Sequence, residues 1–471
     1  MPCLSIRIPD VYHPISVLSL NIFVLSDSKY PFMTNRLTTL FSVMLAVTFV
    51  LLRSSAQPLP SDSVPFAAPS PSPAVVPSAV ADYPTVVRQR VDSLLRLPLL
   101  EYSQLGLCVY DLTADSLIVA HGQHQCLRPA SCEKVITAAA AIETLGNDFR
   151  LSTTLFVDTL DSTLIIKAAF DPFFRADDMH AFVDAVCQAG IKEVRCPIVF
   201  DCTVKDTLAL GWGWCWDDDN PSLSALLYNG GDTFASHFRS ALVEAGILHP
   251  DSAFSVRYAP TPSSVRPLVV RSHTLQQVLQ PMLKRSDNLM AEVLFYHLAA
   301  HSGKTYAGRR EATDAIKAFI HRASPHAQHF QIADGSGLSL YNYTTPAILV
   351  DVLRHAWNDT NLYEALFPAL PVMGKDGTLR RRCHGQSAQH RVWAKTGTVE
   401  GVSTLAGYAM APNGHRLAFA IMNQGIRRTR DGQHFQDLLC NALTEPLRRT
   451  DIEPDSISAL PLPDSTKVPQ E

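Results

Sequence analysis

Strand-like segments stand at both ends of the globular part of this 471-residue chain, and this arrangement constrains the fold more than any other feature. Each segment is a short run rich in β-branched, aromatic and other apolar residues. They are residues 105–112, 116–122, 391–398, 403–411 and 415–423. Pro412-Asn413-Gly414 joins the last two with the sequence of a hairpin turn. We therefore predict an α+β fold whose sheet is built from both ends of the chain.

Helical periodicity dominates the segments between these strands. We expect helices at 85–97, 131–145, 176–191, 232–247, 273–283, 287–300, 345–357 and 432–446. Further strands are expected at 153–158, 163–169 and 194–201, and a loop rich in Trp and Asp at 205–230. The chain shows no internal repeat, which excludes a repeat architecture.

The N-terminal part of the chain has the pattern of a secretory signal peptide. Residues 37–52 are apolar and uncharged, a basic residue precedes them, and the small residues Ser54 and Ala56 follow where signal cleavage needs them. Met33 lies just before this run, and we expect translation to start there, with residues 1–56 forming the signal region. The run is short for a membrane span, although a retained anchor is the alternative.

We therefore expect an exported protein of the periplasm or cell envelope, with no stable membrane anchor after cleavage. A linker rich in Pro, Ser, Ala and Val covers residues 57–84 and cannot bury a core. A polar tail covers 451–471. The chain between them is long enough for two or three domains.

Composition excludes two classes of function. With 40 Lys and Arg against 44 Asp and Glu, the net charge of −4 suits neither a strongly basic nucleic-acid binder nor an acidic disordered chain.

The 10 Cys are scattered without a C-x-x-C pair, and the 17 His include no H-E-x-x-H motif. We therefore expect no metal and no other cofactor. Export allows one or two disulfides, whose pairing the sequence leaves open.

Ser131 and Lys134 form the first motif with chemical meaning. They are three residues apart on a predicted helix, so their side chains lie on one face with Cβ atoms about 5–6 Å apart. A buried Lys that has lost its proton can take the proton of a Ser hydroxyl and make it a nucleophile. The S-x-x-K pattern alone is common, and a helix N-cap and a surface charge are the ordinary explanations of these two residues.

Two further motifs follow in the chain. Ser286-Asp287-Asn288 stands directly before an apolar helical segment, where it would also serve as an N-cap. Lys395-Thr396-Gly397 lies in a predicted strand, where one exposed Lys would be ordinary. Each triplet is rare by chance. Together with S-x-x-K, and in this order, they mark the penicillin-recognising serine acyl-transferases.

Longer segments resemble one family of these enzymes, the D-alanyl-D-alanine carboxypeptidase/endopeptidases, or class C low-molecular-mass penicillin-binding proteins. The resemblance covers residues 85–446. It is carried by 129–156, 332–339, 370–382 and 394–408, and by 213–218 and 223–229 for a domain that the family inserts between its first and second motifs.

The resemblance implies a fold and an activity. The fold would combine a penicillin-recognising domain at 85–152 and 262–450, with a five-stranded antiparallel sheet flanked by helices, and one inserted α/β domain at 153–261. The activity would be that of a serine-type D-Ala-D-Ala carboxypeptidase, a hydrolase that cuts peptidoglycan stem peptides and cross-links through an acyl-enzyme. Its partners would be these peptides and inhibitory β-lactams, with no nucleic acid.

The resemblance also implies a role for the residues of the first two motifs. Ser131 resembles the acylated nucleophile and Lys134 its activating base. Ser286 resembles the relay that returns a proton to the leaving amine, and Asn288 resembles the residue that binds the amide of the substrate. The catalytic centre would therefore join two distant segments of the chain.

The third motif would hold the rest of the substrate. Lys395 and Thr396 resemble the anchor of its terminal carboxylate. The backbone N–H groups of Ser131 and Thr398 would form the oxyanion hole. Gly397 suits this place, because a side chain there would crowd a substrate lying along the strand.

The sequence departs from the family in two places. Relatives carry a further β-rich module between the segments that match 223–229 and 233–246, and here the chain runs straight on, so we expect this second inserted domain to be absent. This chain also has Leu340 where relatives commonly place an Arg. In the family, that Arg and an acid resembling Asp218 hold the charged end of the stem-peptide side chain, so we expect weaker discrimination of that end.

Two other interpretations suit the same motifs. A β-lactamase or esterase of the same serine class would need a deacylation base, which the sequence does not place. A catalytically inactive envelope scaffold would not need three intact motifs, and all three are intact here. Nitrocefin hydrolysis, release of D-Ala from a peptide and labelling with a fluorescent penicillin distinguish these alternatives.

Overall fold

The computed structural model describes residues 82–194, 197–217 and 220–447. The expected signal region, most of the linker and the expected tail lie outside the described residues, and so does Asp218. The chain divides into two compact units, 1–76 and 77–471, and the described residues all belong to the second.

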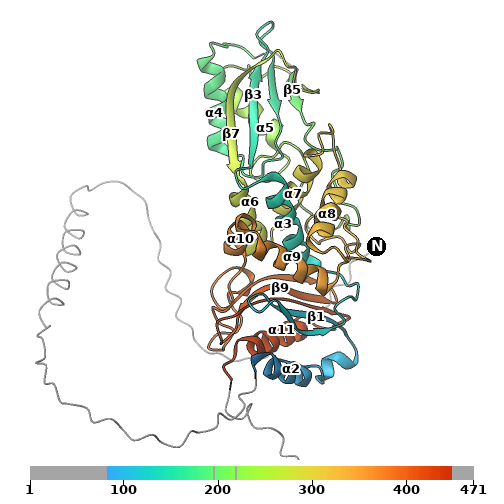
Figure 1. Cartoon of the computed structure of the whole chain (residues 1–471). Coiled ribbons are helices and arrows are strands. Elements are labelled where there is room, and N and C mark those ends of the chain that lie inside the picture. The colour runs from blue at the N-terminus through green and yellow to red at the C-terminus, as the bar shows by residue number, and fades with distance from the viewer. Residues whose placement is uncertain (1–81, 195–196, 218–219, 448–471) are drawn as a thin grey trace, which may run out of the picture. The chain divides into compact units, whose positions relative to one another are not determined.

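The main sheet has five antiparallel strands in the order β2-β1-β10-β9-β8 (Figure 1). The strands are β1 (Gln104–Asp111), β2 (Ser116–His121), β8 (Val392–Val399), β9 (Val402–Met410) and β10 (Arg416–Gln424). β1 pairs with β10 along its whole length, so strands from opposite ends of the chain are neighbours. This confirms the predicted α+β fold with a sheet built from both ends.

Helices cover both faces of the main sheet. α2 (Tyr83–Leu94) and α11 (Thr429–Thr444) pack on one face, and α9 (Pro346–Asn358) packs on the other (Figure 1). Along β10, from Leu417 to Met422, successive residues belong alternately to the two hydrophobic cores. A strand that is buried on both faces has no polar side, which explains why β9 and β10 have continuous apolar sequences.

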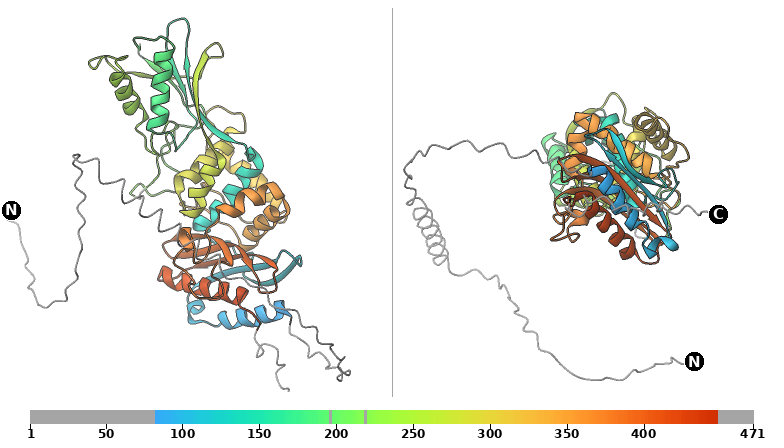
Figure 2. Two further views of the ribbon diagram at one scale, coloured as in Figure 1. Left: turned by 90° about the vertical axis from the view of Figure 1, so that its left-hand side faces the viewer. Right: turned by 60° about the horizontal axis from the view of Figure 1, so that its bottom comes forward.

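The helices on the α9 side surround one buried helix, α3 (Glu133–Leu145). Its neighbours besides α9 are α6 (Leu275–Lys284), α7 (Asn288–Ala300), α8 (Arg309–Ala323) and α10 (Thr360–Leu366). Figure 2 shows these yellow and orange helices beside the red strands of the main sheet. The four Ala at 138–141 are fully buried, and such small side chains let the neighbouring helices approach. α8 and α10 are not among the helices expected from the sequence.

A second sheet has five strands in the order β6-β5-β4-β3-β7. The strands are β3 (Arg150–Val157), β4 (Leu164–Lys167), β5 (Ile198–Asp201), β6 (Val256–Tyr258) and β7 (Arg266–Thr274). β3 is antiparallel to β4 and β7, whereas β4, β5 and β6 are parallel. This mixed sheet, with its own hydrophobic core, has the α/β character expected of the inserted part.

The second sheet extends beyond the expected bounds 153–261, because β7 pairs with β3 from Arg150 onward. β6 and β7 are not among the strands expected from the sequence, and the helix expected at 273–283 begins only at Leu275, after β7. Two helices, α4 (Ala176–Gln188) and α5 (Phe234–Glu244), contribute to the core of this sheet.

The connection into α5 is short. A tight turn from Tyr228 to Gly231, closed by two backbone hydrogen bonds of 2.9 and 3.0 Å, leads into α5 at Phe234. The segment therefore leaves no room for a further module, as expected from the sequence.

Candidate active site

Ser131 lies in a turn that the main sheet holds in place. The 3₁₀ turn Ala130–Cys132 runs directly into α3, and Ala130 has a positive φ of 45°. Non-glycine residues adopt such a conformation at an energetic cost, frequently at functional sites. Thr404 Oγ1 on β9 donates to the Pro129 carbonyl at 2.7 Å. No side chain caps the turn or α3, so Ser131 is not the N-cap that its sequence position allowed.

Lys134 contacts Ser131 from one turn further along the helix. Its Nζ donates to Ser131 Oγ at 3.0 Å, to Asn288 Oδ1 at 2.7 Å and to the Ser336 carbonyl at 2.7 Å. The side chain is fully buried, so it is not a surface charge. Burial lowers the pKa of Lys134 to about 8, although nearby carboxylates oppose this shift. The amine is therefore partly in its basic form near neutral pH.

The three residues of the second motif have different structural roles: one caps a helix, and two contact the lysines of the other motifs. Asp287 is the N-cap of α7, and its side chain accepts a hydrogen bond from Met290 N at 3.4 Å. Ser286 has a positive φ of 64°, and its Oγ accepts a hydrogen bond from Lys395 Nζ at 2.8 Å. Asn288 is hydrogen-bonded to the amine of Lys134. Ser286 and Asn288 therefore belong to the site, whereas Asp287 belongs to the helix.

Lys395 brings the third motif to the second. It lies on β8, fully buried, and its Nζ also donates to the Thr396 carbonyl at 2.6 Å. Burial, reinforced by the positive charge of Lys134, lowers the pKa of Lys395 to about 7. The three motifs, far apart in the chain, are thus joined by hydrogen bonds between side chains.

Gly397 is required by a close contact with the turn that carries Ser131. A Cβ atom at Gly397 would lie 2.6 Å from the Pro129 carbonyl oxygen and 3.0 Å from Cys132 N. A side chain would therefore push β8 away from the nucleophile. The sequence interpretation gave a different reason, crowding of the substrate.

Two threonines of β8 flank Gly397. Thr396 Oγ1 donates to Thr378 Oγ1 at 2.8 Å, and the sequence interpretation did not single out Thr378. Thr398 is exposed at the end of the strand. Their roles toward a substrate, including the oxyanion hole, stay predictions.

Asp334 is a buried acid close to Lys134 that the sequence interpretation did not assign. Its carboxylate accepts four hydrogen bonds of 2.7 Å each, from Trp214 Nε1, Asn342 Nδ2 and the backbone N–H groups of Gly337 and Ser339. These donors stabilise a negative charge opposite the buried amine. The segment 332–339 carries the family resemblance, and this was the only sequence signal for the residue.

Glu133 and Glu292 are further buried acids near Lys134. Burial raises the pKa of Glu292 to about 8, and the charge of Asp334 adds to the effect. Both carboxyl oxygens of Glu133 are buried without a hydrogen-bond partner among the described residues, and burial raises its pKa well above the usual range. The base thus lies among acids that favour their neutral forms.

Leu340 lies at the surface and is 40% exposed. Its carbonyl accepts a hydrogen bond from Arg128 Nε at 3.2 Å, so a guanidinium group lies beside the position where relatives commonly have Arg. Asp218, the predicted partner for a substrate ammonium, lies outside the described residues.

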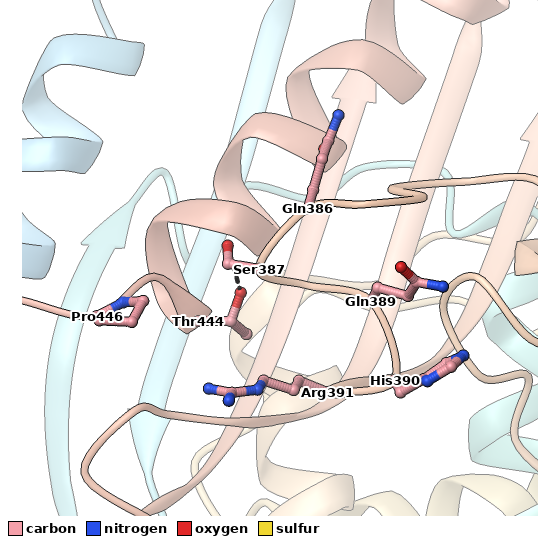
Figure 3. Close-up of a pocket in the computed structure, with 7 residues that line it drawn as sticks. All are labelled: Gln386, Ser387, Gln389, His390, Arg391, Thr444 and Pro446. Carbon is pink, nitrogen blue, oxygen red and sulfur yellow. Dashed lines mark hydrogen bonds between the residues drawn. The ribbon is translucent and has the colours of Figure 1, made fainter.

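A separate hollow of about 420 Å³ lies beside the end of α11 (Figure 3). It is lined by Gln386, Ser387, Gln389, His390, Arg391, Thr444 and Pro446. Thr444 Oγ1 donates to Ser387 Oγ at 3.1 Å, and no lysine is among the lining residues. Ser387 therefore lacks the activating amine that Ser131 has.

The described part of the chain holds no cluster of metal-ligating side chains. Within residues 82–194, 197–217 and 220–447, no group of three or more His, Cys, Asp or Glu is arranged to hold a metal ion. The cysteines described, eight in number, are free thiols. No helix in these same segments is both long and apolar enough to cross a membrane.

The fold and the three joined motifs define a penicillin-recognising serine enzyme. The D-Ala-D-Ala carboxypeptidase 3 (S13) family matches the chain at residues 87–227 and 224–445. The chain therefore belongs to this family and is an enzyme of the serine D-Ala-D-Ala carboxypeptidase class. The two matched parts meet inside the segment 223–229, next to the place where a second inserted module was expected to be absent.

Individual relatives agree with this assignment. The chain is 24% identical to the D-alanyl-D-alanine carboxypeptidase DacB of Haemophilus influenzae, over 71% of this chain and 88% of the relative. It is 27% identical to the D-alanyl-D-alanine carboxypeptidase of an Actinomadura strain, over 72% and 81%. The crystal structure of penicillin binding protein 4 from H. influenzae matches with a TM-score of 0.66 at 22% identity, over 74% and 97%. The family resemblance and the fold class are confirmed.

Proposed function

We propose that the chain hydrolyses peptidoglycan stem peptides and cross-links through an acyl-enzyme on Ser131. The observation that carries this proposal is the 3.0 Å contact between Lys134 Nζ and Ser131 Oγ, made by a fully buried amine whose pKa burial lowers to about 8. A base with such a pKa matches the operating pH of the reaction.

Acylation needs the proton of Ser131 to leave as its oxygen attacks. Lys134, in its neutral form, takes that proton, and Ser131 Oγ bonds to the carbonyl carbon of the penultimate D-Ala. The peptide C–N bond then breaks. The hydroxyl of Ser286 passes a proton to the leaving amine of the terminal D-Ala and regains one from the protonated Lys134. Water later cleaves the ester, which restores the Ser131 hydroxyl and releases the peptide acid. Asn288, which accepts a hydrogen bond from Lys134, would bind the amide of the substrate.

Lys395 and Thr396 would bind the terminal carboxylate. The pKa of Lys395 is lowered to about 7 in the free protein because of burial and the charge of Lys134. A bound carboxylate would raise this pKa again and keep the amine charged, so binding and protonation would reinforce each other. Substrates without a free carboxylate would lose this contribution.

The expected setting is the cell envelope. The apolar run 37–52 and the small residues that follow support export, with the mature protein beginning near Gln57 in the periplasm. N-terminal sequencing of the exported protein tests this expectation. Recovery of residues 37–52 in a membrane fraction would favour a retained anchor instead.

Three assays on the purified mature protein test the proposed activity. We expect release of D-Ala from a stem pentapeptide, covalent labelling by a fluorescent penicillin, and nitrocefin turnover that is slow compared with peptide turnover. Fast nitrocefin turnover without D-Ala release would instead indicate a β-lactamase. Absence of both labelling and turnover would indicate an inactive scaffold.

A further inference from the structure

Glu292 is a buried acid that the reaction above does not use. It lies one helical turn after Asn288 in α7 and is 1% exposed. Its carboxyl group accepts a hydrogen bond from Gly335 N at 3.1 Å and is also hydrogen-bonded by the Ser336 hydroxyl. The carbonyl of the same Ser336 accepts the 2.7 Å hydrogen bond from Lys134 Nζ. Ser336 therefore contacts both the acid and the base.

A cavity of about 330 Å³ reaches Glu292 and Asp334. Its outer wall includes Leu208, Leu210 and Trp212, which are 58%, 46% and 43% exposed, so the cavity opens to solvent. Its volume accommodates several water molecules, for which the Glu292 carboxyl group is a polar partner. None of the residues of the three motifs lines this cavity. Glu292 therefore lines a cavity that is separate from the residues of the three motifs.

The charges around Glu292 couple it to the base. The titratable and charged groups that face it are Glu133 and Lys134 of α3, Asp334, Tyr296 of its own helix and Arg309 of α8. Burial raises the pKa of Glu292 to about 8 and lowers the pKa of Lys134 to about 8. The two groups thus titrate over the same pH range, and the charge of each favours the charged form of the other.

We propose that Glu292 is a positioning residue for acylation: its carboxyl group exchanges protons with water in the cavity, and its charge sets how readily Lys134 gives up its own proton. The proposal rests on the proposed function, because it takes Lys134 as the base. An ionised Glu292 holds the proton on Lys134, whereas a neutral Glu292 lets the amine become basic. Each group exchanges its proton with water, so no proton passes between them.

The test is the pH dependence of the labelling rate constant with a fluorescent penicillin. Glu292→Gln has nearly the same shape and cannot ionise, so Lys134 should lose its proton at lower pH. We expect the acidic limb of the rate profile to move down by about one pH unit, which is about a tenfold faster rate on that limb. The first-order rate constant reports only on folded, reactive molecules.

Two variants serve as controls. Glu133→Gln makes the same change beside Lys134, but Glu133 has no hydrogen-bond partner among the described residues and does not line the cavity, and burial raises its pKa well above the usual range, so the limb should move much less. Glu292→Asp retains a carboxyl group and should keep the limb close to that of the unmodified enzyme. An equal shift in the Glu133 variant would overturn the assignment to Glu292.

A purely structural role for Glu292 predicts a different result. Glu292→Gln would then be labelled more slowly at every pH, and the acidic limb of the rate profile would not move. That outcome overturns the proposal. If the Gln variant does not fold, Ser336→Ala decides instead, because loss of this hydroxyl keeps Glu292 neutral to higher pH. The limb should then move in the same direction by a smaller amount. If the unmodified enzyme is never labelled at Ser131, the proposed function is wrong. This outcome differs from those that overturn only the role of Glu292.

Discussion

The second sheet holds a buried charge with a complete set of hydrogen-bond partners, whereas beside Ser131 the buried acid Glu133 has none among the described residues. Asp201 at the end of β5 shows the first situation. Both its oxygens accept hydrogen bonds from the backbone and side chains of Thr203 and Thr261, at 2.6–3.0 Å. Burial alone would raise the pKa of Asp201, but these donors outweigh it and the pKa is lowered. Such a carboxylate stabilises the fold as an anion.

The surroundings of Ser131 show the opposite arrangement. Two lysines are buried there with lowered pKa values, and Glu133 has no partner for either carboxyl oxygen among the described residues. Ala130 and Ser286 adopt positive φ angles. Each of these features costs folding free energy, and each lies beside a group for which we propose a role in proton transfer or substrate binding. The comparison indicates that the second sheet contributes to the free energy of unfolding, whereas the surroundings of Ser131 lower it.

The largest expected effect is complete loss of acylation in Ser131→Ala. The variant removes the hydroxyl that Lys134 contacts at 3.0 Å and leaves the buried packing intact, so the melting temperature should change little. Labelling with a fluorescent penicillin, with mapping of the labelled peptide, measures the effect. The matched control is Ser387→Ala in the hollow of Figure 3, where the hydroxyl contacts Thr444, and this variant should label normally. Labelling of the Ser131 variant at another serine would contradict the assignment.

The next effect in size is expected for Lys395→Ala. A charge-assisted hydrogen bond to the substrate carboxylate contributes about 1.5–3 kcal/mol, so acylation should slow by about ten- to a hundredfold or more. Peptides whose terminal carboxylate is amidated should lose less. The kcat/KM ratio for the two peptides measures this difference, with Lys167→Ala, an exposed lysine of β4, as the control. Equal losses on both peptides would show that Lys395 does not bind the carboxylate.

The second sheet should respond in stability instead of chemistry. Asp201→Asn removes the charge from a site with four donors and should lower the free energy of unfolding by about 2–3 kcal/mol at neutral pH, with normal penicillin labelling. Because the pKa of Asp201 is lowered in the folded protein, this difference is fully present above the unfolded pKa of about 3.9. It disappears as the pH falls through the lower, folded value. Urea unfolding at several pH values measures it, and a difference that does not depend on pH would contradict the electrostatic explanation.

The two regions also differ in how far their sequences predict them. The main sheet could be predicted because its strands are continuous apolar runs joined by a strong hairpin signal. β6 and β7 were missed, because β6 has three residues and β7 is partly exposed on both faces, so neither shows an apolar alternation. β6 and β7 form because they pair with β5 and β3, and their own sequences do not indicate that they are strands.

The site divides in the same way. Ser131, Ser286 and Lys395 could be named because the S-x-x-K pattern and two rare triplets, in a fixed order, have a known chemical meaning. The acids Glu133, Glu292 and Asp334 belong to no such pattern, and only the packing of α3, α7 and the 332–339 segment shows that they surround Lys134. One local signal existed, since Glu292 is the only acid in the apolar stretch of α7.

The smallest expected effect concerns the charged end of the substrate side chain. A diaminopimelate side chain ends in an ammonium and a carboxylate, and Leu340 offers the carboxylate no donor. We therefore expect the enzyme to use peptides that end in an ammonium alone about as well as diaminopimelate peptides, with Asp218 the predicted partner of the ammonium. Leu340→Arg should shift the preference toward diaminopimelate by about 1.5 kcal/mol, the low end for a hydrogen bond to a charged group, because the position is 40% exposed. The kcat/KM values of both proteins on the two peptides measure the shift. A strong preference for diaminopimelate in the unmodified enzyme would contradict this expectation and point to Arg128, whose guanidinium already lies against the Leu340 carbonyl.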